Sequence, residues 1–309
     1  MPLSQRKLIF LYILVVVIWG TTWMAIKVSV ADLPPFLSAS IRFFCAAFLL
    51  WIIASYRHQK ITWSSGAMKL YIMVGVGNYF IGYGFTYWGA VYIYSSVTAI
   101  LWATMPLMVS VIAHRMIPGE RLSFWRITGI LVSTGGTIFI VSGQWQNLDV
   151  SAVKGIILVM ISVFGGALSN VYYKKHVESE SALVLNMVGM FLGAIFLLAG
   201  SAISESWTEA RFTIPAIGAL IYLAVFGSAI AYTIYFWMFR HLSVVTMSYT
   251  TFFIPIIAAI VGWFVLGEAL SWRTIFGGLL ILAGVAIADH RRSKKYSDVV
   301  NVAATPTSV

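Results

Sequence analysis

A short segment of this chain occurs twice. Residues 119–123 read Gly-Glu-Arg-Leu-Ser, and residues 267–271, at an offset of 148 residues, read Gly-Glu-Ala-Leu-Ser. At the same offset Gly129 falls on Gly277 and Gly136 falls on Gly284. A repeat of this size constrains the architecture before any single element does, because each copy must form the same kind of unit. The sequence therefore predicts two related halves, residues 1–146 and 147–288, followed by a disordered polar tail at 289–309.

Composition places both halves in a membrane. Sixty per cent of the residues are apolar and 10% are charged, whereas a soluble domain has about 25% charged residues. A bilayer core requires about 20 apolar residues per helix, and the apolar runs here are continuous rather than alternating as in a barrel. We expect an all-α membrane protein with ten transmembrane helices, five per half: Leu8–Lys27, Pro35–Ala54, Leu70–Ala90, Ser95–Ala113, Trp125–Val141, Gly155–Tyr173, Leu183–Ile203, Ile217–Phe239, Val244–Leu266 and Trp272–Ala288.

The basic residues indicate the orientation, because Lys and Arg concentrate in cytoplasmic loops. With a cytoplasmic N-terminus, fifteen of the 20 Lys and Arg residues fall on the cytoplasmic side and four on the other side. We expect both termini to be cytoplasmic in a multi-pass protein of the inner (plasma) membrane. Because each half has an odd number of spans, the second half is inverted, an arrangement that recurs in secondary transporters.

Motifs for other functions are missing from the sequence. It contains no HExxH, GxSxG or phosphate-binding GxxxxGK[ST] pattern, and Cys45 is its single cysteine. The basic residues are scattered over loops instead of forming a nucleic-acid-binding stripe. We expect no enzyme activity, catalytic residue, metal, cofactor or nucleic-acid partner. The expected partners are a small-molecule substrate and the lipid bilayer, for a monomer with an oligomer left open; a channel, receptor or membrane enzyme is the alternative class.

Three motifs resemble those of a known family. Residues 19–27 read Trp-Gly-Thr-Thr-Trp-Met-Ala-Ile-Lys, residues 34–35 are Pro-Pro with Arg-Phe at 42–43, and Gly-Glu-x-Leu-Ser occurs in both halves. Together with the ten spans they resemble the drug/metabolite transporter superfamily, specifically its EamA-domain exporters. The resemblance covers Leu8–Ala288 and implies export of amino acids, related metabolites or drugs by alternating access through a central cavity. We favour aromatic or hydrophobic amino acids as cargo, with broad-specificity export of drugs as the alternative.

Aromatic and polar residues at helical spacing mark the expected cavity. A Tyr hydroxyl or Asn amide is costly to bury without a partner, and lipid supplies none, so such residues should face the bundle axis. The alternatives are an interfacial belt for the rings and interhelical hydrogen bonds for the amides. The predicted substrate-binding residues are Trp19, Trp23, Asn78, Tyr79, Tyr83, Thr98, Trp102, Ser169, Asn170, Tyr232, Tyr235 and Tyr249.

Charged residues and prolines suggest further roles. Arg42 lies inside a span, where an Arg costs about 2.5–3.5 kcal/mol, and no span contains an acid to pair with it. It should bind backbone carbonyls, water or a substrate carboxylate, or extend outward to the membrane surface. Pro106 and Pro255 sit at matching places and should kink their helices, as gates or as fixed shape. Glu120 and Glu268 precede helices, where we expect capping, with gating or proton coupling as the alternative. The spans contain no buried acid or His as a proton relay, so facilitated diffusion and proton coupling both remain open.

Overall fold

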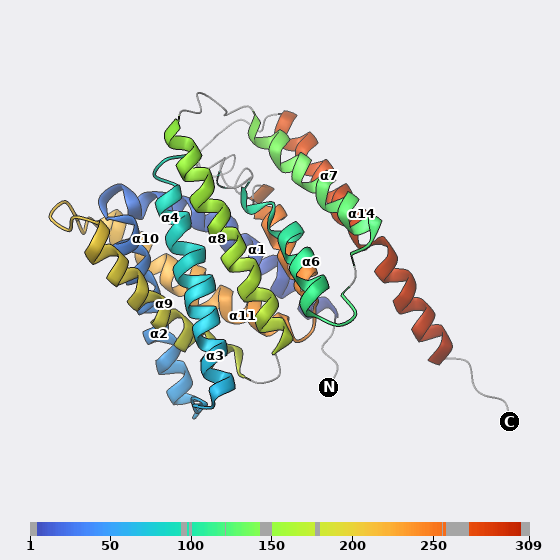
Figure 1. Ribbon diagram of the computed structural model, residues 1–309, viewed down its shortest axis with the longest axis horizontal. Helices are drawn as coiled ribbons and strands as arrows, with labels where there is room; N and C mark the ends of the chain where they lie inside the picture. Colours follow the sequence, from blue (N-terminus) through green and yellow to red (C-terminus); the bar gives the residue numbers. More distant parts are fainter. Residues whose placement is uncertain are drawn as a thin grey trace.

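The computed structural model is a bundle of helices (Figure 1) and describes residues 5–93, 98, 101–120, 122–142, 150–176, 180–254, 256–257 and 272–303. All regular structure in these ranges is helical, and none is β-strand. The elements are α1 (Gln5–Asp32), α2 (Pro35–Tyr56), α3 (Ser65–Val74), η1 (Gly75–Gly84), α4 (Phe85–Gly89), α6 (Met105–Met116), α7 (Phe124–Val141), α8 (Val150–Lys175), α9 (Ala182–Ser204), α10 (Ile214–Tyr222), η3 (Leu223–Ile230), α11 (Ala231–Met238), α12 (Val244–Ser248) and α14 (Trp272–Ala303).

Helix length and composition agree with a membrane protein. Five helical stretches are long and apolar enough to cross a bilayer: Gln5–Asp32, Pro35–Tyr56, Ala152–Lys175, Ala182–Ser204 and Ile214–Met238. The all-α membrane class is therefore confirmed. The count of ten spans and the cytoplasmic termini stay predictions, and parts of two expected spans, Ser95–Ala113 and Val244–Leu266, lie outside the described ranges.

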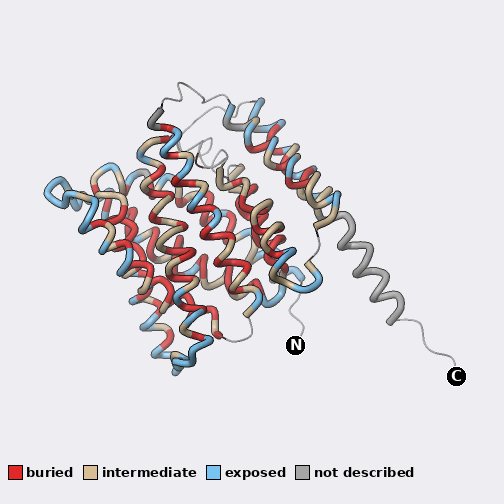
Figure 2. Tube along the Cα trace, in the orientation of Figure 1, coloured by how far each residue is buried: buried red, intermediate tan, exposed pale blue. Residues whose placement is uncertain are grey.

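Buried residues gather toward the middle of the bundle, and exposed ones lie on its outside (Figure 2). Large apolar side chains such as Phe48, Phe164 and Phe191 are about half exposed, as expected of a surface that lipid covers. Because lipid is as apolar as a leucine side chain, close approach of small residues holds membrane helices together. A Cβ added to Gly193 of α9 would lie 2.5 Å from the Cβ of Tyr79 in η1. The glycine is needed for this packing.

Helices α7 and α14 lie side by side at one edge of the bundle (Figure 1). A Cβ added to Gly129 would lie 2.3 Å from the Gly284 carbonyl oxygen, and one added to Gly136 would lie 2.7 Å from the Gly277 carbonyl oxygen. Between them, Ser133 Oγ donates to the carbonyl oxygen of Ile281 at 3.1 Å. The contact is reciprocal, since Gly277 and Gly284 are the repeat counterparts of Gly129 and Gly136.

Two spans contain a π-helical segment that the sequence analysis read as ordinary helix. Segment η1 begins at Gly75 and η3 begins at Leu223, again 148 residues apart. A π-helix changes the regular hydrogen-bonding pattern, and such segments are frequent at functional sites. Two carbonyls in these segments accept side-chain bonds: Gly82 O accepts from Ser162 Oγ at 2.7 Å, and Gly227 O accepts from Trp19 Nε1 at 3.2 Å.

Two local expectations differ from the structure. The kink expected at Pro106 is instead a helix start, because α6 begins at Met105 and Pro106 occupies its first turn. The first turn needs no proline N–H, so the residue is accommodated there. Pro255 lies outside the described residues. The tail expected to be disordered from Asp289 continues α14 as helix to Ala303, and residues 289–303 contain no glycine or proline to end it.

Candidate functional site

A cavity lies at the centre of the bundle, between the faces of α1, η1, α8 and α11. Its volume is about 60 Å³. Its lining combines aromatic rings, aliphatic side chains, hydroxyls and two amides. The lining residues are Trp19, Thr22, Trp23, Ile26, Asn78, Tyr83, Thr86, Trp102, Met105, Asn170, Tyr232, Tyr235, Thr250, Thr251 and Ile254.

Most of the predicted substrate-binding residues are brought together here. Eight of the twelve line the cavity, and they come from segments far apart in the sequence: Trp19, Trp23, Asn78, Tyr83, Trp102, Asn170, Tyr232 and Tyr235. Their placement is the one expected for side chains that avoid lipid.

The other four predicted residues, Tyr79, Thr98, Ser169 and Tyr249, are buried but do not line the cavity. The hydroxyl of Tyr79 donates to Asn186 Oδ1 of α9, away from the cavity. The reason is local, because Tyr79 and Tyr83 would share a face of an α-helix but lie in the π-helical η1, whose turns hold more residues. Ser169 instead packs against Gly77, and the ring of Tyr249 packs against Phe252 at 6.0 Å.

Seven lining residues were missed by the sequence analysis: Thr22, Ile26, Thr86, Met105, Thr250, Thr251 and Ile254. Three of them stood close to predicted residues, since Thr22 and Thr86 each follow a predicted aromatic by three positions and Thr250 follows Tyr249 directly. Helical spacing from those aromatics could have found Thr22 and Thr86, but not Thr250, because adjacent residues lie on different faces of a helix. The aliphatic residues carried no signal, because such side chains occur on every face of a membrane helix.

One wall of the cavity is built from aromatic rings. The ring of Trp19 lies 5.0 Å from that of Tyr232 and 4.8 Å from that of Tyr235, measured between centroids. The hydroxyl of Tyr232 donates to the hydroxyl of Tyr83 at 2.6 Å, and Trp19 Nε1 donates to Gly227 O at 3.2 Å. Packed ring pairs add about 0.5–1.5 kcal/mol each beyond area burial. The wall is held in place from behind and presents ring surface to the cavity.

The polar atoms of the lining differ in whether they are paired. The hydroxyls of Thr22, Thr250 and Thr251 each donate to a carbonyl one turn earlier in their own helix, at 2.7–2.9 Å. By contrast, Asn78 Nδ2 and Asn170 Oδ1 are buried without a hydrogen-bond partner. The remaining amide nitrogen, Asn170 Nδ2, donates to the Tyr235 hydroxyl at 3.4 Å. Both residues line the cavity, and each has one amide atom without a partner.

Arg42 lies behind the aromatic wall and is 1% exposed. Its Nε donates to Ser228 Oγ at 2.7 Å, Nη1 to the Tyr87 hydroxyl at 3.3 Å and Nη2 to Gly227 O at 3.3 Å. The expected extension to the membrane surface is thus wrong, because these three acceptors hold the side chain inside the bundle. Bonding to a backbone carbonyl, another of the alternatives, is what the structure contains.

The charge of Arg42 is close to the cavity although Arg42 does not line it. Its guanidinium carbon lies 4.8 Å from the centroid of the Tyr83 ring, and Tyr83 does line the cavity. Within the described residues, no carboxylate lies within ion-pair distance of Arg42. A full positive charge therefore stands behind the wall without an ionic partner, and it favours negative charge on the η1 side of the cavity.

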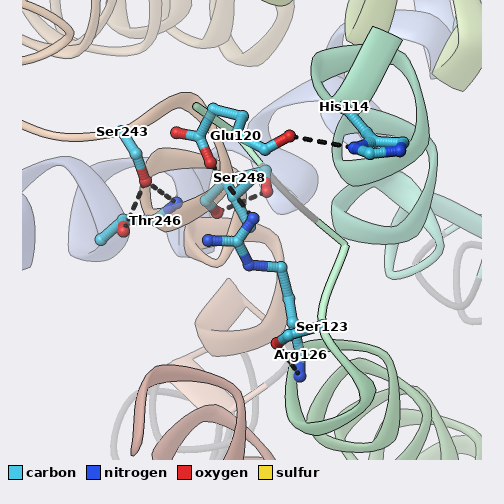
Figure 3. A network of polar contacts seen from close by, with 8 residues as sticks. His114, Glu120, Ser123, Arg126, Ser243, Thr246 and Ser248 are labelled. Atoms are coloured by element: carbon cyan, nitrogen blue, oxygen red, sulfur yellow. Dashed lines mark hydrogen bonds and ion pairs between the residues drawn. The ribbon is translucent and has the colours of Figure 1, made fainter. Parts of the chain in front are cut away.

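Figure 3 shows the polar contacts around Glu120, which does not line the cavity. Glu120 Oε2 accepts from Arg126 Nη1 at 3.1 Å, and its carbonyl oxygen lies 3.2 Å from His114 Nδ1. The start of α7 is capped by Ser123, whose Oγ accepts from the backbone N–H of Arg126 at 3.2 Å. Capping was expected of Glu120, but Ser123 occupies the N-cap position itself, and Glu120 pairs with a side chain of the first turn instead. Glu268 lies outside the described residues.

Comparison with known proteins gives one family. The model of the EamA-like transporter family matches residues 6–142 and again residues 153–288. The uncharacterized transporter YoaV of Bacillus subtilis is 29% identical over 274 residues, which are 88% of this chain and 92% of YoaV. Protein PagO of Salmonella typhimurium is 24% identical over 89% of this chain and 90% of its own. The uncharacterized inner membrane transporter YedA of Escherichia coli is 27% identical over 88% of this chain and 87% of its own.

A solved structure described as "Crystal structure of protein" superposes with a TM-score of 0.79 at 15% identity. The match covers 92% of this chain and 97% of the other. At this identity the likeness is one of fold.

Proposed function

Because the chain belongs to the EamA-like transporter family, we propose that it is a secondary transporter that exports amino acids or related small metabolites from the cytoplasm across the inner (plasma) membrane. The observation that carries the proposal is the central cavity, which lies inside the bundle rather than at its surface and is lined by rings and two unpaired amides. A site of this kind, apolar with few polar groups, is typical of a small-molecule binding site.

The lining favours an aromatic or hydrophobic amino acid as cargo. Trp19, Tyr232 and Tyr235 offer ring surface on which a flat side chain can stack, and Met105 and Ile254 add aliphatic surface. Stacked and edge-on ring contacts favour aromatic over small polar side chains. No fully charged side chain lines the cavity among the described residues, which disfavours a strongly charged cargo side chain.

We further propose that two inverted halves alternate access to this cavity. Three observations support two related halves: the family model matches twice, η1 and η3 begin 148 residues apart, and α7 and α14 make a reciprocal glycine contact. Reciprocal contacts are what a two-fold axis between copies produces. The rocking of such halves about a central site is the usual cycle of inverted-repeat carriers.

The test is uptake of a radiolabelled amino-acid panel, including Trp, Phe, Thr and Cys, into proteoliposomes with and without an imposed pH gradient. We expect saturable uptake of Trp and Phe, and each should inhibit uptake of the other. Stimulation by the gradient would indicate proton coupling, and indifference to it would indicate a facilitator. Absence of saturable uptake for every amino acid, with saturable uptake of planar drug-like compounds, would favour broad-specificity drug export instead. Linear, non-saturating flux would contradict a carrier and favour a channel.

A further inference from the structure

Two amides in the cavity have unpaired atoms of opposite kind. Asn78 leaves a donor, Nδ2, without a partner, and Asn170 leaves an acceptor, Oδ1, without a partner. The two side chains are 4% and 2% exposed, and both line the cavity. No other lining residue in the described part of the chain has a buried side-chain nitrogen or oxygen without a hydrogen bond. Because buried polar groups in proteins are nearly always paired, an unpaired donor and acceptor in one cavity indicate a ligand that supplies both partners.

The two amides lie next to a single contact between η1 and α8. They follow Gly77 of η1 and Ser169 of α8 directly in sequence, and a Cβ added to Gly77 would lie 3.1 Å from Ser169 Cβ. One turn before Asn170, a Cβ added to Gly166 would lie 3.8 Å from Asn78 Oδ1. The donor and the acceptor are therefore positioned by the same pair of packed backbones and can bind one small head group together.

Charge differs between the two sides of this site. On the η1 side, the guanidinium of Arg42 lies 4.8 Å from the Tyr83 ring centroid, with no carboxylate among the described residues within ion-pair distance. On the α8 side, Asn170 donates to the hydroxyl of Tyr235, whose ring packs 4.8 Å from that of Trp19. Ring faces attract cations, and an uncompensated guanidinium attracts anions. The negative end of a dipolar ligand therefore belongs near Asn78 and its positive end near Asn170.

We propose that Asn78 and Asn170 form a recognition site for the zwitterionic head group of free α-amino acids. Asn78 Nδ2 donates to the substrate carboxylate, and Asn170 Oδ1 accepts from the substrate ammonium. The substrate side chain then lies against the ring wall of Trp19 and Tyr232. This inference rests on the proposed transport function and adds to it that the head group, shared by all amino acids, is read by hydrogen bonds while the side chain is read by stacking.

The test measures ligand binding to the purified protein in detergent, with the quenching of tryptophan fluorescence as the readout. The three probes are L-phenylalanine, its methyl ester, which lacks the carboxylate, and 3-phenylpropionate, which lacks the ammonium. We expect the wild type to bind phenylalanine about 10-fold more tightly than either analogue, because each analogue leaves one amide unpaired. Asn78→Leu should abolish the preference over the ester and keep the preference over phenylpropionate. Asn170→Leu should do the reverse.

The matched control is Phe226→Leu. Phe226 is the repeat counterpart of Asn78, is 45% exposed and does not line the cavity. It should keep both preferences. If Asn78→Leu fails to fold, Asn78→Asp keeps the shape and replaces the donor with a negative charge, so it should bind the cationic ester more tightly than phenylalanine.

The outcomes separate the inference from the proposed function. Wild-type protein that transports amino acids but binds all three probes equally overturns the head-group site and leaves the transport function standing. If Asn78→Leu and Asn170→Leu both keep the preference for phenylalanine over its two analogues, the head-group site is likewise overturned and the transport function stands. Wild-type protein that neither binds nor transports any amino acid overturns the proposed function, and the head-group site with it.

Discussion

The two spans with π-helical segments have similar backbones but use their polar atoms differently. In η1, Asn78 lines the cavity, and its amide nitrogen is buried without a hydrogen-bond partner. In η3, the counterpart of Asn78 is Phe226, on the outside of the bundle, and the nearby polar atoms are occupied. Gly227 O accepts from Trp19 and Arg42, and Ser228 Oγ accepts from Arg42.

The difference suggests that duplication preserved the irregular backbone while the side chains diverged. A π-helical turn disturbs the regular hydrogen-bonding ladder and makes backbone carbonyls available to side chains. On the η3 side the available acceptors hold a permanent buried cation. On the η1 side, the amide nitrogen of Asn78 has no such partner within the protein and can bind a solute. Changes at η3 should therefore mainly alter stability, and changes at Asn78 in η1 should mainly alter transport.

The largest expected effect is at Arg42, the cation that η3 holds. Arg42→Met removes the donor to the buried hydroxyls of Ser228 and Tyr87, while Gly227 O loses one of its two donors and keeps Trp19 Nε1. We expect a loss of about 2–3 kcal/mol in the free energy of unfolding, because a buried group that loses its partner retains its desolvation penalty. Thermal unfolding of the purified protein in detergent measures the loss. Arg42→Lys keeps the positive charge but not the planar guanidinium. Its unfolding midpoint should lie between those of the wild type and Arg42→Met.

An unfolding midpoint of Arg42→Met equal to that of the wild type would contradict the assignment of a structural role to η3. If uptake nonetheless fell in that variant, Arg42 would act on the solute through its charge alone.

The next effect contrasts Asn78 with its counterpart Phe226. Asn78→Ala should lower the rate of uptake at low solute concentration about 10-fold, corresponding to one lost hydrogen bond to a charged group. Phe226→Ala should leave uptake within about two-fold, since its side chain faces away from the cavity. Proteoliposome uptake, normalised to the amount of inserted protein, measures both. Equal losses in the two variants would remove the functional difference between the spans.

The residues of the cavity wall could be predicted from the sequence, but most of the contacts that hold the wall in place could not. Trp19, Tyr83 and Tyr232 were predictable because rings with polar atoms at helical spacing avoid lipid. Tyr79 was misplaced because the prediction assumed an α-helix where η1 is a π-helix. The partners of Arg42 in η3 were beyond reach, since they lie more than 180 residues away in sequence and one is a backbone carbonyl.

A smaller effect is expected at Ser228, which binds only one atom of Arg42. Ser228→Ala removes the acceptor 2.7 Å from Nε and should cost about 1 kcal/mol in the free energy of unfolding. Ser204→Ala is the control, because Ser204 is exposed and bonds only to a carbonyl of its own helix. Thermal unfolding should place Ser228→Ala between this control and Arg42→Met. A loss as large as that of Arg42→Met would mean that Ser228 alone holds the guanidinium.

The smallest expected effect is at Trp19, which connects the cavity wall to η3. Trp19→Phe keeps a ring against Tyr232 and Tyr235 but removes the Nε1 donor to Gly227 O. Because Gly227 O still accepts from Arg42 Nη2, the carbonyl stays paired, and we expect a loss of only about 0.5 kcal/mol. Trp51→Phe, at a half-exposed position on the bundle surface, is the matched control for thermal unfolding. In a Ser228→Ala background, the loss caused by Trp19→Phe should be larger, because a less firmly held guanidinium no longer bonds to Gly227 O. If the losses of the two single variants simply add in the double variant, Trp19 and Arg42 bind Gly227 O independently.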